Sequence, residues 1–351
     1  MKNKIFLLLI IVISISSCKK KMEFSIDLFG NTEEILIGQE IQLTGEFLLD
    51  PYFIEVIDSF LIAIDTDNST ILNIINLNNG EQLFRTLKRG KGPYELIFTT
   101  NLHKYSPKNR HFYIGNEKIL LYNLDSLIVN YENYEPNIIF NKKSNEFSGL
   151  DVLYINDSLY LSSTNFQFQK KYCLLDKEGS LITASLDYPE DDFSEDFTFK
   201  SLAYQGRFVK HPILNKFAFC MVNTPYFEIG NIENDTIKII KDYYFNRINY
   251  KPIELSNNFQ SVVMDKSNAY GFLRIVSTNE FIYLLYSGRN EEDFGDNIFQ
   301  SPVILVFDWE GQPIKRYHLD NEINCFTVDE TNSILYGISN KPKPMVFKYK
   351  I

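Results

Sequence analysis

The chain of 351 residues has few of the side chains that usually form a catalytic or metal centre. Its four histidines form no His-x-x-x-His or His-Glu-x-x-His pair, so the sequence gives a zinc site no support. It has no Gly-x-Ser-x-Gly elbow, and no glycine-rich loop opens a helix in the way that a nucleotide site requires. We therefore expect no catalytic residue, no metal and no cofactor. The histidines are His103, His111, His211 and His318.

Cysteine and positive charge are also scarce. Beyond Cys18, the chain has Cys173, Cys220 and Cys325, an odd number without Cys-x-x-Cys spacing. Each lies in an apolar, strand-like run, which predicts three small buried residues, with a disulfide between two of them as the alternative. Lysine and arginine number 35 against 45 aspartate and glutamate, a formal net charge of −10. Nucleic acid is not an expected partner, because binding it requires a basic face.

No hydrophobic run is long enough to cross a bilayer, which takes about 20 residues. The longest begins the chain: Lys2 and Lys4 precede the apolar run 5–15, which ends in Ile15-Ser16-Ser17-Cys18. This ending resembles the bacterial lipobox, which implies that residues 1–17 are a signal peptide and that Cys18 carries lipid. The alternative is an ordinary signal peptide with an incidental cysteine. Cleavage before Cys18 takes the formal charge from −10 to −12.

The segment after Cys18 predicts where the protein is held. Residues 18–32 are expected to be a lipid-anchored tether and residues 33–351 the folded domain. The partner implied by the lipid is a membrane, in the cell envelope and at the outer membrane. Lys19, Lys20 and Lys21 follow the anchor. Surface-exported lipoproteins tend to carry acidic residues there, so we expect the periplasmic face.

Helical periodicity is missing, whereas aromatic residues are abundant. Aromatics make up 15% of the chain, with 29 Phe and 22 Tyr, and such side chains favour strands. One hairpin recurs six times: an apolar strand, a short polar turn and a more strongly apolar strand. The first copy is 53–57, Asp58-Ser59 and 60–64. The residues that follow the six turns are Phe60, His111, Leu159, Phe217, Phe281 and Ile334, separated by 51, 48, 58, 64 and 53 residues.

Spacings of this size match the blades of a β-propeller. A second hairpin follows in several copies, for example around Asn78-Asn79-Gly80, and two hairpins complete a four-stranded blade. The last copy lacks one strand, and 35–44 has no hairpin of its own, so we expect 35–44 to supply that strand. The predicted fold is therefore all-β, a six-bladed propeller closed by an N-terminal strand. A sandwich or a β-helix is the alternative.

Two segments carry a resemblance to a known family. Residues 89–95, Arg-Gly-Lys-Gly-Pro-Tyr-Glu, are similar to the Gly-x-Gly-Pro-Gly-Glu loop after the first blade of TolB-like propellers, although Tyr94 replaces a common glycine. The stretches 283–288, 306–311 and 317–320 are similar to the end of that family. The chain thus resembles Gram-negative lipoproteins with a TolB-like six-bladed propeller domain. The resemblance implies the fold and no catalytic residues.

The loop 89–95 is also the candidate ligand site. Crossings between blades lie on the face where propellers usually bind, so Arg89, Lys91, Tyr94 and Glu95 are candidate contacts. The alternative is a purely structural glycine turn. The acidic runs 187–196 and 291–297 lack the regular ligand spacing of an EF-hand, and we interpret both as solvated loops between blades.

Two classes of function remain open. The first is a non-catalytic binding or scaffolding module for an unknown protein or glycan. The second is a propeller hydrolase or lyase acting on a glycan or lactone, which needs two suitably separated acids. Because residues of different blades cannot be placed from the sequence, the lining of the central channel decides between them.

Overall fold

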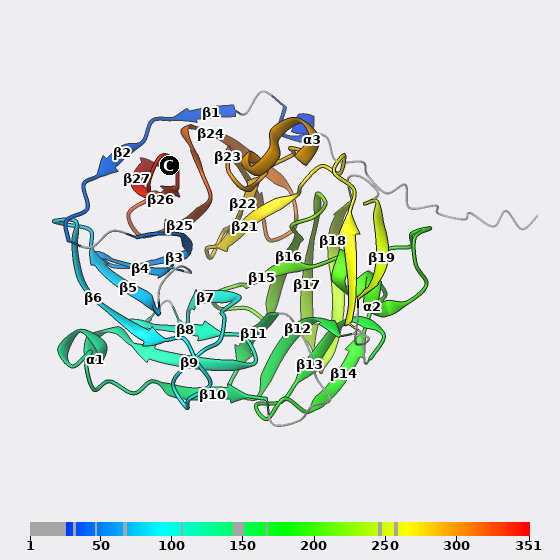
Figure 1. Cartoon of the computed structure of the whole chain (residues 1–351), viewed down its shortest axis with the longest axis horizontal. Coiled ribbons are helices and arrows are strands. Elements are labelled where there is room, and N and C mark those ends of the chain that lie inside the picture. The colour runs from blue at the N-terminus through cyan, green and yellow to red at the C-terminus, as the bar shows by residue number, and fades with distance from the viewer. Residues whose placement is uncertain are drawn as a thin grey trace, which may run out of the picture.

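The computed structural model shows six sheets arranged as blades around an axis, with one strand of each blade facing the centre, and a seventh, two-stranded sheet outside the ring of blades (Figure 1). It describes residues 26–30, 33–45, 48–65, 69–106, 108–142, 151–165, 168–244, 248–255 and 259–351. The predicted signal peptide, Cys18 and Lys19 to Lys21 lie outside these residues. The innermost strands contact one another in succession, which forms the wall of a central channel.

The first three blades are antiparallel sheets whose strands follow chain order. The first contains β3 (Pro51–Ile57), β4 (Phe60–Asp65), β5 (Thr70–Asn76) and β6 (Glu81–Lys88). The second contains β7 (Asn101–Lys104), β8 (His111–Gly115), β9 (Lys118–Asn123) and β10 (Asn137–Asn141), with helix α1 (Leu124–Val129) before β10. The third contains β11 (Asp151–Asn156), β12 (Leu159–Asn165), β13 (Lys170–Leu175) and β14 (Leu181–Ser185).

The other blades carry additions. The fourth contains β15 (Gly206–Lys210), β16 (Lys216–Met221), β17 (Tyr226–Glu233) and β18 (Thr236–Tyr244), preceded by α2 (Phe197–Ala203) and followed by the hairpin β19 (Tyr250–Leu255) and β20 (Phe259–Met264). The fifth contains β21 (Phe272–Ser277), β22 (Phe281–Tyr286), β23 (Ser301–Asp308) and β24 (Pro313–Ile323). The sixth contains β25 (Cys325–Asp329), β26 (Ile334–Ser339) and β27 (Met345–Lys350).

All six predicted hairpins are present, and the six-bladed fold is confirmed. The turn residues made these hairpins predictable, because tight turns require positive φ and Asp and Gly adopt it readily. In the first blade, Asp58 between β3 and β4 has a φ of 53°, and Gly80 between β5 and β6 has a φ of 71°. At Gly80 a side chain is also excluded, since an added Cβ would lie 1.9 Å from the Gln42 carbonyl oxygen.

The N-terminal segment closes the ring, but in more steps than predicted. Only β2 (Gln39–Ile41) forms the outer strand of the sixth blade, antiparallel to β27. Strand β1 (Glu33–Leu36) instead pairs in parallel with β24 of the fifth blade. Thr44 then bridges to Glu81 on β6 of the first blade. The segment therefore connects three blades across the point of closure, along the outer rim in Figure 1.

Two further expectations require correction. The acidic run 291–297 does not lie between blades: it belongs to the β22–β23 connection within the fifth blade, where it forms α3 (Glu291–Phe294) and the start of the 3-10 helix η3 (Gly295–Phe299). Asn290 caps α3 by accepting from the amide of Asp293. The run 187–196 does lie between the third and fourth blades, as predicted.

The ordered fold also begins before residue 33. Ile26–Phe29, in the predicted tether, form the 3-10 helix η1. Phe29 is 3% exposed, and its ring lies 5.2 Å from that of Phe307 on β23. Burial of this aromatic side chain holds the end of the predicted tether on the fifth blade.

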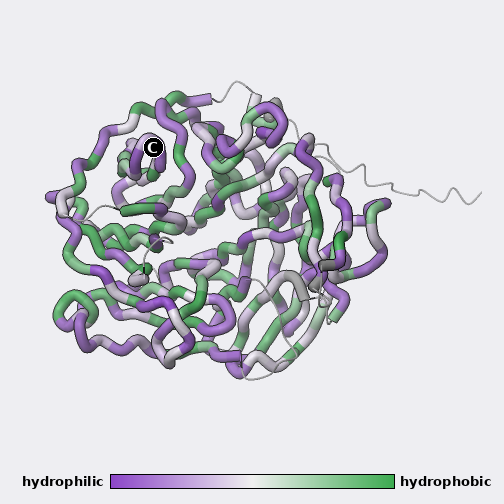
Figure 2. Tube along the Cα trace, in the orientation of Figure 1, coloured by the Kyte–Doolittle hydropathy of each residue, from purple (hydrophilic) through white to green (hydrophobic). Residues whose placement is uncertain are grey.

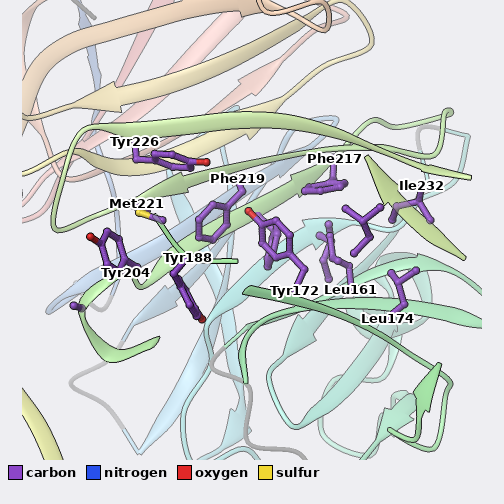
Figure 3. Packing of buried hydrophobic residues seen from close by; sticks show 14 of the residues in the cluster. Leu161, Tyr172, Leu174, Tyr188, Tyr204, Phe217, Phe219, Met221, Tyr226 and Ile232 are labelled. Atoms are coloured by element: carbon purple, nitrogen blue, oxygen red, sulfur yellow. The ribbon is translucent and has the colours of Figure 1, made fainter. Parts of the chain in front are cut away.

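The core lies between blades. Hydrophobic positions, green in Figure 2, recur along the strands of every blade. Figure 3 shows the contact of the third and fourth blades, where Tyr172 of β13 packs against Phe217 and Phe219 of β16. Cys173, Cys220 and Cys325 are free and buried, as predicted.

Candidate functional site

A cavity of about 350 Å³ occupies the ring axis, and each of the six inner strands contributes to its lining. It extends to the turns that join the first and second strands of the blades, among them Asp58, Arg110 and Thr278. We call the side with these turns the turn face, and the side with the connections between blades the crossing face. A ligand pocket of this volume accommodates a small molecule.

Arg207 and Arg274 line the inner end of the cavity, and both contact Tyr52. Arg274 donates from Nε and Nη2 to the Tyr52 carbonyl oxygen at 2.9 and 2.6 Å, and its guanidinium lies 3.9 Å from the Tyr52 ring centroid. Arg207 donates from Nη2 to the Tyr52 hydroxyl. Arg207 and then Arg274 lower the pKa of Tyr52 to about 8, because they stabilise the tyrosinate against the opposing effect of burial.

Asp151 connects three blades beside these arginines. Its Oδ1 accepts from Thr100 Oγ1 at 3.2 Å and from Asn101 Nδ2 at 3.1 Å, and its Oδ2 accepts from the Phe208 amide at 3.4 Å. Burial raises the pKa of Asp151 to about 6, although the hydrogen bond from Asn101 and the charge of Arg207 oppose this shift. The carboxylate is thus fully engaged as an acceptor inside the protein.

Two further titratable groups line the channel. Burial, followed by the charge of Lys210, lowers the pKa of His103 to about 4, so this imidazole is neutral at neutral pH. Burial also lowers the pKa of Lys210 to about 8. The Lys210 ammonium donates to the Ile155 carbonyl at 3.1 Å and lies 4.6 Å from the Tyr154 ring centroid.

The sequence-predicted loop lies at a different place, on the crossing face between β6 and β7. Arg89 lines a smaller pocket of about 200 Å³ together with Tyr52 and Phe98. Lys91 and Tyr94 are exposed on the loop surface. The structure therefore places Arg89 near the axis on the crossing face, whereas none of the four predicted residues lines the central cavity.

The Glu95 side chain folds back over the two glycines of the loop. Glu95 Oε2 accepts from the Gly92 amide at 2.9 Å, and a Cβ on Gly90 would lie 2.1 Å from the same oxygen. Lys118 of β9 holds the loop from outside by donating to the carbonyls of Gly92, Pro93 and Glu95 at 2.7, 2.9 and 3.2 Å. Glu95 thus stabilises the conformation of the loop through its bond to Gly92. Lys118 also stabilises the loop, and sequence reasoning missed this residue.

Sequence reasoning also missed Arg207, Lys210 and Arg274. A signal was present: Arg274 interrupts the apolar strand β21, and Arg207 and Lys210 flank the buried pair Phe208-Val209 of β15. A charged residue in a strand that must face a core or a channel is unusual enough to mark a site.

Among the described residues, no group of three or more His, Cys, Asp and Glu side chains could hold a metal ion. No helix among the same residues is long and apolar enough to cross a membrane.

The fold and the axial cavity define a six-bladed β-propeller with a central pocket. The family profile described as TolB-like 6-blade propeller-like matches residues 30–331, and the chain belongs to this family. No curated protein matches.

Solved structures share the fold at low identity. A protein of Bacteroides fragilis that is described as exported is 12% identical with a TM-score of 0.54, and the match covers 91% of this chain and 98% of that protein. A member of the DUF4221 family from Bacteroides vulgatus is also 12% identical, with a TM-score of 0.50 and coverage of 88% and 98%.

Proposed function

We propose that this protein is a lipid-anchored, non-catalytic binding module that works outside the cytoplasm and takes its ligand in the axial cavity. The lipobox-like ending at Cys18 supports the anchor, and the description of the Bacteroides fragilis relative as exported supports the location. The proposed attachment is to the outer membrane through residues 18–32, with the basic Lys19 to Lys21 favouring the periplasmic face.

The anchor is tested by Cys18→Ser. This variant should lose acylation and remain unprocessed or be released from membranes, as shown by lipid labelling and cell fractionation. Maturation at the wild-type size together with membrane retention would contradict the anchor. Protease treatment of intact cells then distinguishes the two faces of the outer membrane.

The observation that supports binding is the mixed lining of the cavity. Apolar side chains such as Phe53 and Val276 share it with the cations of Arg207, Lys210 and Arg274. Pockets that bind small molecules combine apolar walls with a few polar groups that fix orientation. A propeller with such a lining is suited to hold a ligand by contact, without a bond-breaking step.

A filled cavity provides the test. Val276→Trp places a large side chain in the channel, whereas the double variant Lys91→Ala/Tyr94→Ala alters the exposed crossing loop. Native mass spectrometry of protein purified from its own envelope should show a bound small molecule in the wild type and the loop variant, and a loss in Val276→Trp. Loss in the loop variant alone would move the site to the loop. Retention of the ligand in Val276→Trp would contradict the cavity.

One observation favours the rival hydrolase or lyase. Asp151 lies in the cavity, and burial raises its pKa to about 6, the direction that suits a general acid. Its hydrogen bonds to three donors favour a structural role instead. Turnover of glycans or lactones by the wild type that disappears in Asp151→Asn would replace the binding function with catalysis.

A further inference from the structure

The inner end of the axial cavity holds two guanidinium groups, those of Arg207 and Arg274. Within the described part of the chain, neither Arg207 nor Arg274 forms a salt bridge with a carboxylate. Arg274 is only 7% exposed, and its acceptors are the carbonyl oxygens of Tyr52 and Leu273. Arg207 Nε is buried without a hydrogen-bond partner.

The two cations also repel each other. Burial and then the charge of Arg207 lower the pKa of Arg274, so the two guanidiniums are close enough to interact. A buried charge without a counter-ion is costly, and proteins normally pair such groups. Arginine nevertheless remains protonated in proteins, so a bound anion would offset the cost of holding these two charges side by side.

Two acids of the cavity wall, Glu55 and Asp151, accept hydrogen bonds from other groups, although the charge of Arg207 also acts on Asp151. Glu55 Oε1 accepts from Thr327 Oγ1 at 2.8 Å and lies 3.4 Å from Lys104 Nζ. Asp151 accepts from two side chains and one amide, as described above. Lys210 adds a third cation, which also forms no salt bridge with a described residue. The inner cavity thus carries surplus positive charge in a chain whose net charge is −10.

Resting on the proposed function, we propose that the axial cavity binds a small organic anion whose carboxylate, sulfate or phosphate group contacts Arg207 and Arg274. These groups share oxygens that match the donors of a guanidinium. The remaining volume and apolar walls of the cavity accommodate the rest of a small molecule, which enters from the turn face. A folded protein or a polymer does not fit within about 350 Å³.

Tyr52 supplies an internal reporter. The arginines that stabilise its tyrosinate are the groups that the anion would occupy, so anion binding should raise the pKa of Tyr52 from about 8. Buried tyrosines such as Tyr122 and Tyr188 have raised pKa values and ionise later. The first tyrosinate seen in an ultraviolet pH titration should therefore be that of Tyr52, and Tyr52→Phe should remove it.

The experiment compares wild type with Arg207→Met, Arg274→Met and the control Arg89→Met, an exposed arginine of the crossing loop. Sodium sulfate, sodium phosphate and sodium glucuronate are titrated against sodium chloride of equal ionic strength, followed by thermal melting and by the Tyr52 titration. For at least one oxyanion, the change in melting temperature and in the Tyr52 titration should reach saturation in wild type and in Arg89→Met. Each cavity variant should bind it at least tenfold more weakly, and general salt effects cancel between variants.

Equal responses in wild type and in the cavity variants, or no response of wild type beyond that to chloride, would refute an anion site. Failure of the anion inference can be distinguished from failure of the proposed function. If native mass spectrometry still finds a neutral molecule in the cavity, binding stands and the anion inference is wrong. If no ligand is found and Val276→Trp changes nothing, the proposed function itself fails.

Discussion

The buried ion pair between Lys171 and Glu228 should dominate the stability of the contact between the third and fourth blades. Lys171 on β13 and Glu228 on β17 are 3% and 2% exposed, with Nζ and Oε2 2.8 Å apart. The hydroxyls of Tyr172 and Tyr226 both donate to the same carboxylate. Removing one charge leaves the other buried, so Lys171→Met and Glu228→Gln should each lower the free energy of unfolding by about 3–5 kcal/mol.

Urea unfolding measures this loss, and the neighbouring Lys170 provides the control. Lys170 pairs with Asp187 at the surface, with side chains 41% and 68% exposed, so Lys170→Met should cost about 1 kcal/mol or less. The double variant Lys171→Met/Glu228→Gln should cost at least about 1 kcal/mol less than the sum of the single variants, because no isolated charge remains. Additive losses, or single losses as small as that of Lys170→Met, would refute the reasoning.

Three further predictions follow from the closure, the loop and the channel. Deleting 33–44 leaves the outer edge of β27 open, and gel filtration should show aggregation; a monomer with unchanged melting would contradict this. Lys118→Met removes three hydrogen bonds from the loop 89–95 and should cost about 1–3 kcal/mol in urea unfolding, with anion binding unchanged. The pKa of His103 falls from 6.5 to about 4 on folding, so its contribution to stability is lost as pH falls through that interval. In His103→Gln, the free energy of unfolding measured by urea should therefore fall less steeply between pH 6.5 and 4 than in wild type. An equal fall in both proteins would contradict this role of His103.

The blade architecture was predictable because its signals are local. Each first hairpin is marked by a polar turn between apolar strands, and turn residues such as Asp58 adopt the positive φ that the geometry requires. The need for a closing strand also followed from counting strands in the last copy. The parallel pairing of β1 with β24 did not, since nothing in Glu33–Leu36 specifies a partner so far along the chain.

The cavity depends on distances that no local pattern encodes. Arg207 and Arg274 come from the fourth and fifth blades, and Tyr52 comes from the first. They meet because the ring brings the starts of the inner strands together at the axis. The crossing loop was the candidate from sequence because Arg89, Lys91, Tyr94 and Glu95 lie close together in the chain at a crossing between blades. Glu95 and Lys118 nevertheless account for much of its structure.

The position of Tyr52 determines how the two pockets relate. Its side chain lines the smaller pocket on the crossing face, while its hydroxyl and carbonyl oxygens accept from Arg207 and Arg274, which line the larger cavity. Tyr52 therefore lies between the two pockets. For a ligand to reach Arg89 from the turn face, the Tyr52 side chain would have to move, which would remove the hydroxyl acceptor of Arg207 and the ring that lies against the Arg274 guanidinium. Binding at the crossing loop and binding in the axial cavity should consequently be independent, and variants at Arg89 and Arg207 should act on separate ligands.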